Sequence, residues 1–227
     1  MNFEGTDRWQ MRYPGAVVAC MWLTGLTNPA QSEALDARLD QIEGELRERY
    51  AGFDRAAIRA SAPFDAYERY YRLFGQTYHV QHQVESVALK GKPIPRRAAL
   101  VEAAFAEELS GGILTAMHDA DVIGKTVIAD VAEGDEQVVL YNEKTVQLDA
   151  GDMYMRDDNS ILTSVIRGPA AYGLVTPETT SVAVCVYAPN GVGPDAVRIH
   201  LERIAANMRL ISPAAEIELL EVVAAPA

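Results

Sequence analysis

The sequence predicts an α+β fold in one compact domain. In the first half, apolar residues recur mostly at the spacing of amphipathic helices. In the second half, short alternating runs separated by turn residues are typical of strands. Helices and strands are thus segregated along the chain, which favours α+β over an alternating βαβ fold. No repeat or linker divides the 227 residues, so we expect one domain over 1–227.

The first half opens with an apolar run over 15–23, which we expect to be a core strand. Residues 32–50 are predicted to be a helix, because its apolar residues recur on one face. These residues are Leu35, Leu39, Ile42 and Leu46. Core packing and docking to a partner protein are both open for this face. Further helices are expected over 63–74, 84–89 and 97–109, and an extended connector over 92–95.

The second half has the two-residue period of strands. The expected strands are 126–131, 137–141, 145–148, 153–156, 161–166 and 181–187. A last amphipathic helix follows over 194–209. The tail over 213–227 is expected to be either an added edge strand, centred on 216–223, or a loose segment.

Composition limits the function classes. A net charge of −12 argues against a general nucleic-acid binder and against DNA as a partner, although it allows a local basic patch. The uncharged run over 15–26 is shorter than the ~18 residues of a membrane span, so we expect a cytoplasmic protein without a membrane partner. Cys20 and Cys185 lie in apolar runs and are interpreted as reduced core thiols. No spacing indicates a metal site or an organic cofactor.

One local basic run stands out in this acidic chain. It consists of Lys90, Lys92, Arg96 and Arg97. A phosphate-binding edge is one interpretation, since lysine and arginine make such contacts. A solvated loop balanced by Glu102 and Glu107 is the other.

Two arginines of the second half are candidate ligands for a carboxylate or phosphate. Arg156 and Arg167 end predicted strands, and either could instead pair with a neighbouring acid. Gly168 follows Arg167 and could allow a ligand to approach the backbone closely. Thr176 and Thr179 could donate hydroxyls to a ribose, or cap the turn before the strand at 181.

His118 and Asp119 are the candidate catalytic groups. A histidine oriented by a carboxylate could act as a general base. With Asp121 they could also hold a metal. A polar turn before Ile123 is the structural alternative.

Three segments of the chain form a recognisable set in order and spacing. They are Tyr70 to Pro95 (YYRLFGQTYHVQHQVESVALKGKPIP), His118 to Gly124 (HDADVIG) and Val175 to Val182 (VTPETTSV). Together they resemble stand-alone B3/B4 domain proteins, which are similar to the editing module of the phenylalanyl-tRNA synthetase β-subunit. The first segment is similar to the entry segment of that family, the second to its aromatic-Asp-x-Asp-x-Ile-Gly turn, and the third to its V-T-x-x-T-x-x-V segment. The resemblance covers roughly residues 13–210.

The resemblance implies a single B3/B4-type domain with a mixed central sheet flanked by helices and a cleft for the tRNA acceptor end. In the synthetase, this cleft hydrolyses a mischarged tyrosyl ester. Some positions that are polar in the family are apolar here. They are Ala98, Phe105, Ala116 and Leu174. Three functions therefore stay open: an aminoacyl-tRNA deacylase acting in trans, a non-catalytic module for an amino acid, nucleotide or RNA end, and a scaffold that docks through 32–50.

Overall fold

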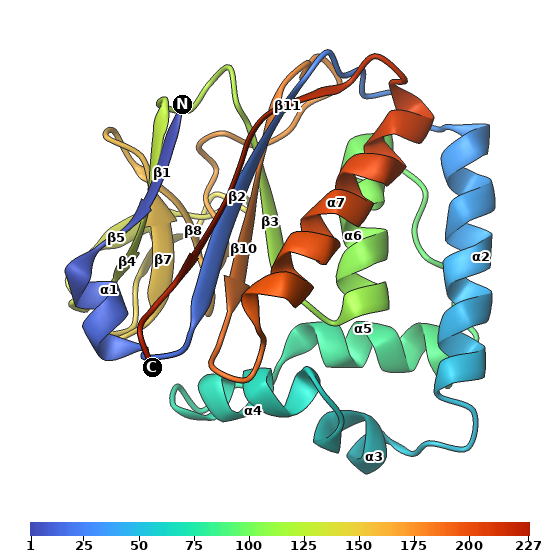
Figure 1. The fold of residues 1–227 in the computed structure, drawn as a ribbon, viewed down its shortest axis with the longest axis horizontal. Coiled ribbons are helices and arrows are strands. Elements are labelled where there is room, and N and C mark those ends of the chain that lie inside the picture. Colours follow the sequence, from blue (N-terminus) through green and yellow to red (C-terminus); the bar gives the residue numbers. More distant parts are fainter.

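The computed structural model describes residues 1–227 and confirms the α+β class. A five-stranded sheet, a four-stranded sheet and a group of helices lie side by side as three layers (Figure 1). The longest helices are drawn on the right of Figure 1, other helices along the bottom, and the five-stranded sheet on the left together with one short N-terminal helix. The four-stranded sheet is the middle layer, so both of its faces are covered.

Helices dominate the first half of the chain, as predicted. Its elements are β1 (Asn2–Gly5), α1 (Asp7–Arg12), β2 (Val17–Thr24), α2 (Glu33–Arg49), α3 (Arg55–Ala60), α4 (Phe64–Arg72), α5 (His79–Ala88) and α6 (Ala99–Gly111). Three short elements, β1, α1 and α3, were not expected from the sequence. Helix α5 begins at His79, five residues before the expected start, because Val80 continues the buried face formed by Val84 and Val87.

Strands dominate the second half. Its elements are β3 (Thr115–Asp119), β4 (Thr126–Val131), β5 (Gln137–Val139), β6 (Thr145–Gln147), β7 (Met153–Arg156), β8 (Ile161–Ser164), β9 (Gly168–Pro169), β10 (Val182–Ala188), α7 (Pro194–Ile211) and β11 (Glu216–Ala224). The expected strand at 216–223 is the edge strand β11, which pairs with β2.

The middle sheet is antiparallel, with the order β11-β2-β10-β3. Both faces of its central strands are buried, which explains their continuous apolar sequence. Cys20 and Cys185 are register partners on β2 and β10, and both are buried free thiols. Strand β3 has only one neighbour and leaves one edge of this sheet unpaired.

The outer sheet has the order β1-β4-β7-β8-β9. Strand β1 runs parallel to β4 while the other pairs are antiparallel, so this sheet is the mixed one. Strands β5 and β6 form a separate hairpin. The outer sheet thus brings β8 and β9, near its end, to the same region as the free edge of β3, where the candidate site lies.

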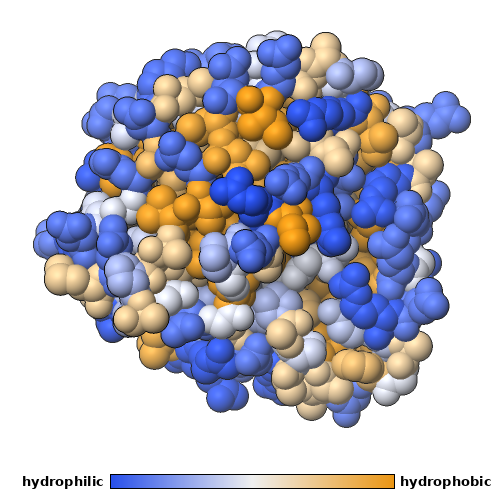
Figure 2. Space-filling view, in the orientation of Figure 1, coloured by the Kyte–Doolittle hydropathy of each residue, from blue (hydrophilic) through white to orange (hydrophobic).

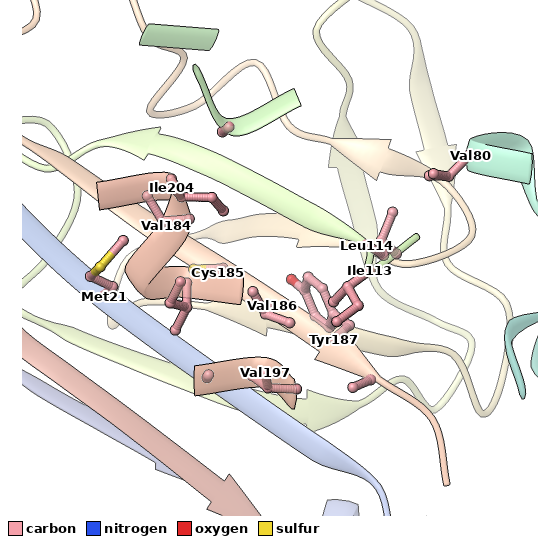
Figure 3. Packing of buried hydrophobic residues seen from close by; sticks show 14 of the residues in the cluster. Met21, Val80, Ile113, Leu114, Val184, Cys185, Val186, Tyr187, Val197 and Ile204 are labelled. Carbon is pink, nitrogen blue, oxygen red and sulfur yellow. The ribbon is translucent and has the colours of Figure 1, made fainter. Parts of the chain in front are cut away.

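Helices α6 and α7 pack on the middle sheet, and α2 packs against both of them. Figure 3 shows Val197 and Ile204 of α7 beside Val184 and Cys185 of β10. The apolar face of α2 is fully buried in this core. Its residues therefore pack inside the protein, which removes the observation that favoured a docking face.

The face seen in Figure 2 has hydrophilic side chains around its edge and apolar patches between hydrophilic side chains near its centre. None of the helices combines the length and the apolar character needed to cross a bilayer.

Glu102 explains how α6 begins without a polar N-cap residue. Its carboxylate accepts hydrogen bonds from the backbone N–H groups of Arg97 and Ala98.

Candidate functional site

A cavity of about 300 Å³ lies at the free edge of β3. Helix α6 forms one wall, β3 a second, and β8 with β9 a third. Most of the lining is apolar, and the apolar residues are Val101, Ala104, Phe105, Leu114, Ala116, Met117, Val165, Pro169, Leu174 and Val175. This volume is at the lower end of the range for small-ligand pockets. The cavity can hold an apolar group about the size of an amino acid side chain.

Helix α6 contributes its residues to the cavity at helical spacing. Four residues of α6 line the cavity, and steps of three, one and three residues between them place them on one face of the helix. They are Val101, Ala104, Phe105 and Glu108. The opposite faces of α6 are also buried, against α2 and α7. On the cavity face itself, Ala104 and Glu108 are buried, Phe105 is partly buried and Val101 is exposed.

Glu108 is the acidic group of the cavity. The side chain is buried, and its Oε2 accepts a hydrogen bond of 2.8 Å from the backbone N–H of Thr115. Desolvation raises the pKa of the carboxyl to about 8, although the Thr115 hydrogen bond opposes this shift. Glu108 is therefore mostly protonated at pH 7.

Ser164 lies on the β8 wall and belongs to a buried polar network. Its hydroxyl donates a hydrogen bond to Asp152 and accepts one of 2.9 Å from the Arg167 backbone N–H. Asp152 also accepts a 2.6 Å hydrogen bond from the Tyr70 hydroxyl. Burial raises the pKa of Asp152 to about 6, against the effect of these hydrogen bonds. The network fixes the Ser164 hydroxyl at the cavity wall.

Two imidazole rings are associated with the cavity. His79 lines it, and its Nδ1 lies 3.4 Å from the Tyr71 hydroxyl. Loss of hydration, followed by the nearby His82, lowers the pKa of His79 below 6.5. Behind the wall, the Nε2 of buried His200 lies 2.7 Å from the Thr115 hydroxyl, and burial lowers the pKa of His200 to about 3. Both rings are therefore mostly neutral at pH 7.

Some residues singled out from the sequence come together at this cavity. Gly168 lines it with a φ of 87°, a conformation that favours glycine. Three of the positions that are apolar here and polar in the B3/B4 family also line it. They are Phe105, Ala116 and Leu174. The fourth such position, Ala98, lies at the start of α6 and outside the lining.

The predicted catalytic pair lies outside the lining of the cavity. His118 is fully buried on β3, and neither of its ring nitrogens has a hydrogen-bond partner. Desolvation lowers its pKa to about 4. Asp119 accepts a hydrogen bond from the Thr179 hydroxyl and one from the Asp121 backbone N–H at 3.0 Å. His118 lies in β3, where it pairs in register with Ala183 of β10. The expected polar turn follows directly over 120–123, where the Asp119 carbonyl accepts hydrogen bonds from the backbone N–H groups of Val122 and Ile123.

The other candidate contacts of the second half also lie outside the lining. The Arg167 guanidinium pairs with Asp149 at 2.9 Å. Arg156 lies 3.9 Å from a carboxylate oxygen of Asp130. Thr176 and Thr179 form one turn, in which the Thr176 backbone N–H donates to the Thr179 hydroxyl at 2.9 Å.

The basic run divides into two groups. Arg96 lies against α2, where its guanidinium contacts the carboxylates of Asp36, Asp40 and Glu43. Lys90, Lys92 and Arg97 are exposed, and none of their side chains forms an ion pair. These three cations remain free to contact an external anion.

Sequence reasoning missed Glu108, Ser164 and Asp152. Glu108 stands in an alanine-rich helix beside Glu107, where an acid is usually a surface residue. The one available signal was its spacing from Val101 and Phe105. Asp152 and Ser164 meet only because β7 and β8 pair, which brings residues 12 apart into contact.

No family model matches the sequence, and no curated protein matches it either. Among solved structures, the chain is similar to the crystal structure of an N-terminal fragment of the phenylalanyl-tRNA synthetase β-subunit from Pyrococcus horikoshii. The TM-score is 0.50 at 12% sequence identity, over 98% of this chain and 54% of that chain. The chain thus spans about half the length of the fragment. At this identity the likeness shows a distantly shared fold.

Proposed function

We propose that this protein binds the aminoacylated 3′ end of a tRNA and hydrolyses the ester, with the amino acid side chain held in the cavity beside α6. The observation that carries the proposal is the cavity itself, which is apolar, about 300 Å³ in volume and bordered by Glu108 and Ser164. Phe105, Ala116 and Leu174 line it, at positions that the B3/B4 resemblance assigns to a substrate pocket.

Ester hydrolysis at this site would need no protein nucleophile. Water adds to the carbonyl carbon, the bond from that carbon to the ribose oxygen breaks, and the ribose oxygen leaves with a proton. Holding ester and water together supplies much of the rate enhancement. In the proposal, the neutral ring of His79 accepts a proton from the water, and the Ser164 hydroxyl positions the reacting groups.

The proposed RNA contacts are the cations that precede α6. Lys90, Lys92 and Arg97 are exposed, and the cavity face of α6 begins at Val101, one helical turn after Arg97. A nucleic acid whose 3′ end enters the cavity could therefore place phosphates along this segment. We also propose Arg167 as a phosphate contact, since it is adjacent to the cavity residue Gly168. Its guanidinium would leave Asp149 and pair with the ligand.

A second candidate function is binding of a small molecule without chemistry. The apolar residues Phe105, Ala116 and Leu174 favour it, because they leave the cavity with few groups that could act in catalysis. The apolar side chain of an amino acid derivative is the kind of group that this lining fits.

The test is deacylation of a panel of mischarged tRNAs by the purified protein, with correctly charged tRNAs as controls. The proposal expects release of the amino acid from at least one mischarged species and not from its control. A folded protein that releases nothing across the panel would overturn the hydrolytic proposal. Thermal stabilisation by an amino acid that is recovered intact would then support the second candidate.

A further inference from the structure

Glu108 differs from every other buried carboxylate of this protein. Nine of the ten buried acidic residues have an arginine partner or at least two hydrogen bonds. Glu108 has neither, since its single hydrogen bond comes from the Thr115 backbone N–H. A buried carboxyl with so few partners is costly to the fold, because burial disfavours the charged form. No contact within the protein compensates for this cost, which favours a role for Glu108 in binding a ligand.

The second oxygen of Glu108 is available to a ligand. Oε1 has no hydrogen-bond partner, and it keeps some solvent-accessible surface. Because Glu108 lines the cavity, this oxygen reaches the open space there. A ligand in the cavity would therefore meet one carboxyl oxygen surrounded by apolar side chains.

No cation of the protein faces this carboxyl. Tyr67 and Tyr71 of α4, and Tyr78 before α5, lie near it, and burial raises the pKa of all three hydroxyls. His79 lines the same cavity, and His200 contacts Thr115, but the pKa of each ring is lowered. All five groups are mostly neutral at pH 7. The positive partner of Glu108 has to come from outside.

We propose that Glu108 binds the protonated amine of a ligand whose body is apolar, such as the α-amino group of an aminoacyl ester. An ammonium group carries three donors and a positive charge, which match the free oxygen and the missing counterion. The α-carboxylate of a free amino acid would have no cationic partner in the lining. The site therefore selects amino acids whose carboxyl is esterified or amidated. This inference rests on the cavity being the ligand site of the proposed function.

Binding of an ammonium ligand requires the ionised form of Glu108, which is the minor form at pH 7. Complex formation is therefore expected to release about one proton near pH 7. The apparent affinity is expected to rise as the pH increases toward 8, for as long as the ligand amine keeps its proton. A neutral ligand that only accepts a hydrogen bond from Glu108 would release none.

The experiment is titration calorimetry of the full chain with the amides of L-leucine, L-methionine and L-phenylalanine, which resist ester hydrolysis. Their N-acetyl derivatives and the free amino acids are the comparison ligands. At least one amide is expected to bind at least about tenfold more tightly than both of its comparison ligands. Measurements in buffers of different ionisation enthalpy give the number of protons released.

The variants are Glu108→Gln and, as a matched control, Glu107→Gln, which lies one residue earlier and pairs with Arg38 outside the cavity. Glu108→Gln is expected to lose at least about tenfold in amide affinity together with the proton release, and Glu107→Gln to keep both. Equal binding of amide and N-acetyl amide, no binding of any amide, or unchanged affinity in Glu108→Gln would overturn the inference.

The two proposals fail in different ways. If amides bind through Glu108 but no mischarged tRNA is hydrolysed, the inference stands and the hydrolytic function fails. If tRNA is hydrolysed equally well by wild type and Glu108→Gln, the function stands and the assignment of Glu108 fails.

Discussion

The Oε2 atom of Glu108 lies 2.8 Å from the backbone nitrogen of Thr115, across the turn that joins α6 to β3. This contact holds an acidic side chain at the wall of an apolar cavity, where solvation is poor. Because α6 is buried on nearly all sides, the carboxyl has little freedom to move to water.

Replacing Glu108 with Gln is expected to stabilise the fold at high pH. The folded pKa of about 8 lies above the ordinary value of 4.5, so the folded state binds more protons, and stability is lost as the pH rises from 4.5 through 8. The neutral amide removes this loss. Between pH 5 and 9, the free energy of unfolding of the variant should gain roughly 2–4 kcal/mol relative to wild type. Urea unfolding at the two pH values checks this, and equal curves would show that Glu108 ionises as freely as a surface acid.

Asp152→Ala is expected to cost about 3 kcal/mol in the free energy of unfolding. The substitution leaves the Tyr70 hydroxyl and the Ile166 backbone N–H without their buried acceptor. Asp149→Ala is the matched control, because that residue pairs with Arg167 at the half-exposed surface and should cost about 0–1 kcal/mol. Urea unfolding at pH 7 measures the free energy of unfolding of both variants. A similar loss in Asp152→Ala and Asp149→Ala would show that the hydrogen bonds of Asp152 do not stabilise the fold.

Acidification is expected to destabilise the protein partly through His118. Its folded pKa of about 4 is below the ordinary 6.5, so the unfolded state binds the extra proton and stability falls as the pH drops from 6.5 toward 4. His118→Leu should remove about 2 kcal/mol of this pH dependence. Urea unfolding between pH 7 and 4.5 is the measurement, with His82→Leu at an exposed position as the control. If the free energy of unfolding of His118→Leu depends on pH as steeply as that of wild type, the ring of His118 is not desolvated in the folded protein.

The double substitution Lys92→Glu and Arg97→Glu is expected to weaken tRNA binding and to lower its salt dependence. Each lost phosphate contact reduces the slope of log affinity against log salt by about 1. Fluorescence anisotropy at several salt concentrations measures both quantities. Lys144→Glu, a charge reversal at an exposed position between β5 and β6, is the control and should behave as wild type. Equal slopes for the three proteins would exclude the segment before α6 as an RNA contact.

The sequence was informative where periodicity was strong. The helix expected over 32–50 is α2, and the strand over 126–131 is β4, because in each case one apolar pattern matches one buried face. The residues after Gly112 are strand-like in sequence, but the extent of β3 is not predicted, because its polar end, His118 and Asp119, is buried only through pairing with β10. Such pairing is a long-range contact that local patterns do not encode.

The candidate site was harder to predict for a physical reason. The cavity collects residues from α6, β3, β8, β9 and the loop at 174–175, so no single segment carries its signature. The family resemblance pointed to Phe105, Ala116 and Leu174, which do meet there. Glu108 could not be predicted from the sequence, because an acidic residue in an alanine-rich helix can equally face a cavity or solvent.

The most direct test of the account is deacylation by a protein whose cavity is filled. Ala116→Leu adds three carbon atoms to the lining, whereas Ala206→Leu adds the same group at an exposed position of α7. On a mischarged tRNA, wild type and Ala206→Leu should release the amino acid at equal rates, and Ala116→Leu at least about tenfold more slowly. Full activity in folded Ala116→Leu, or no release from any mischarged tRNA by wild type, would contradict the account.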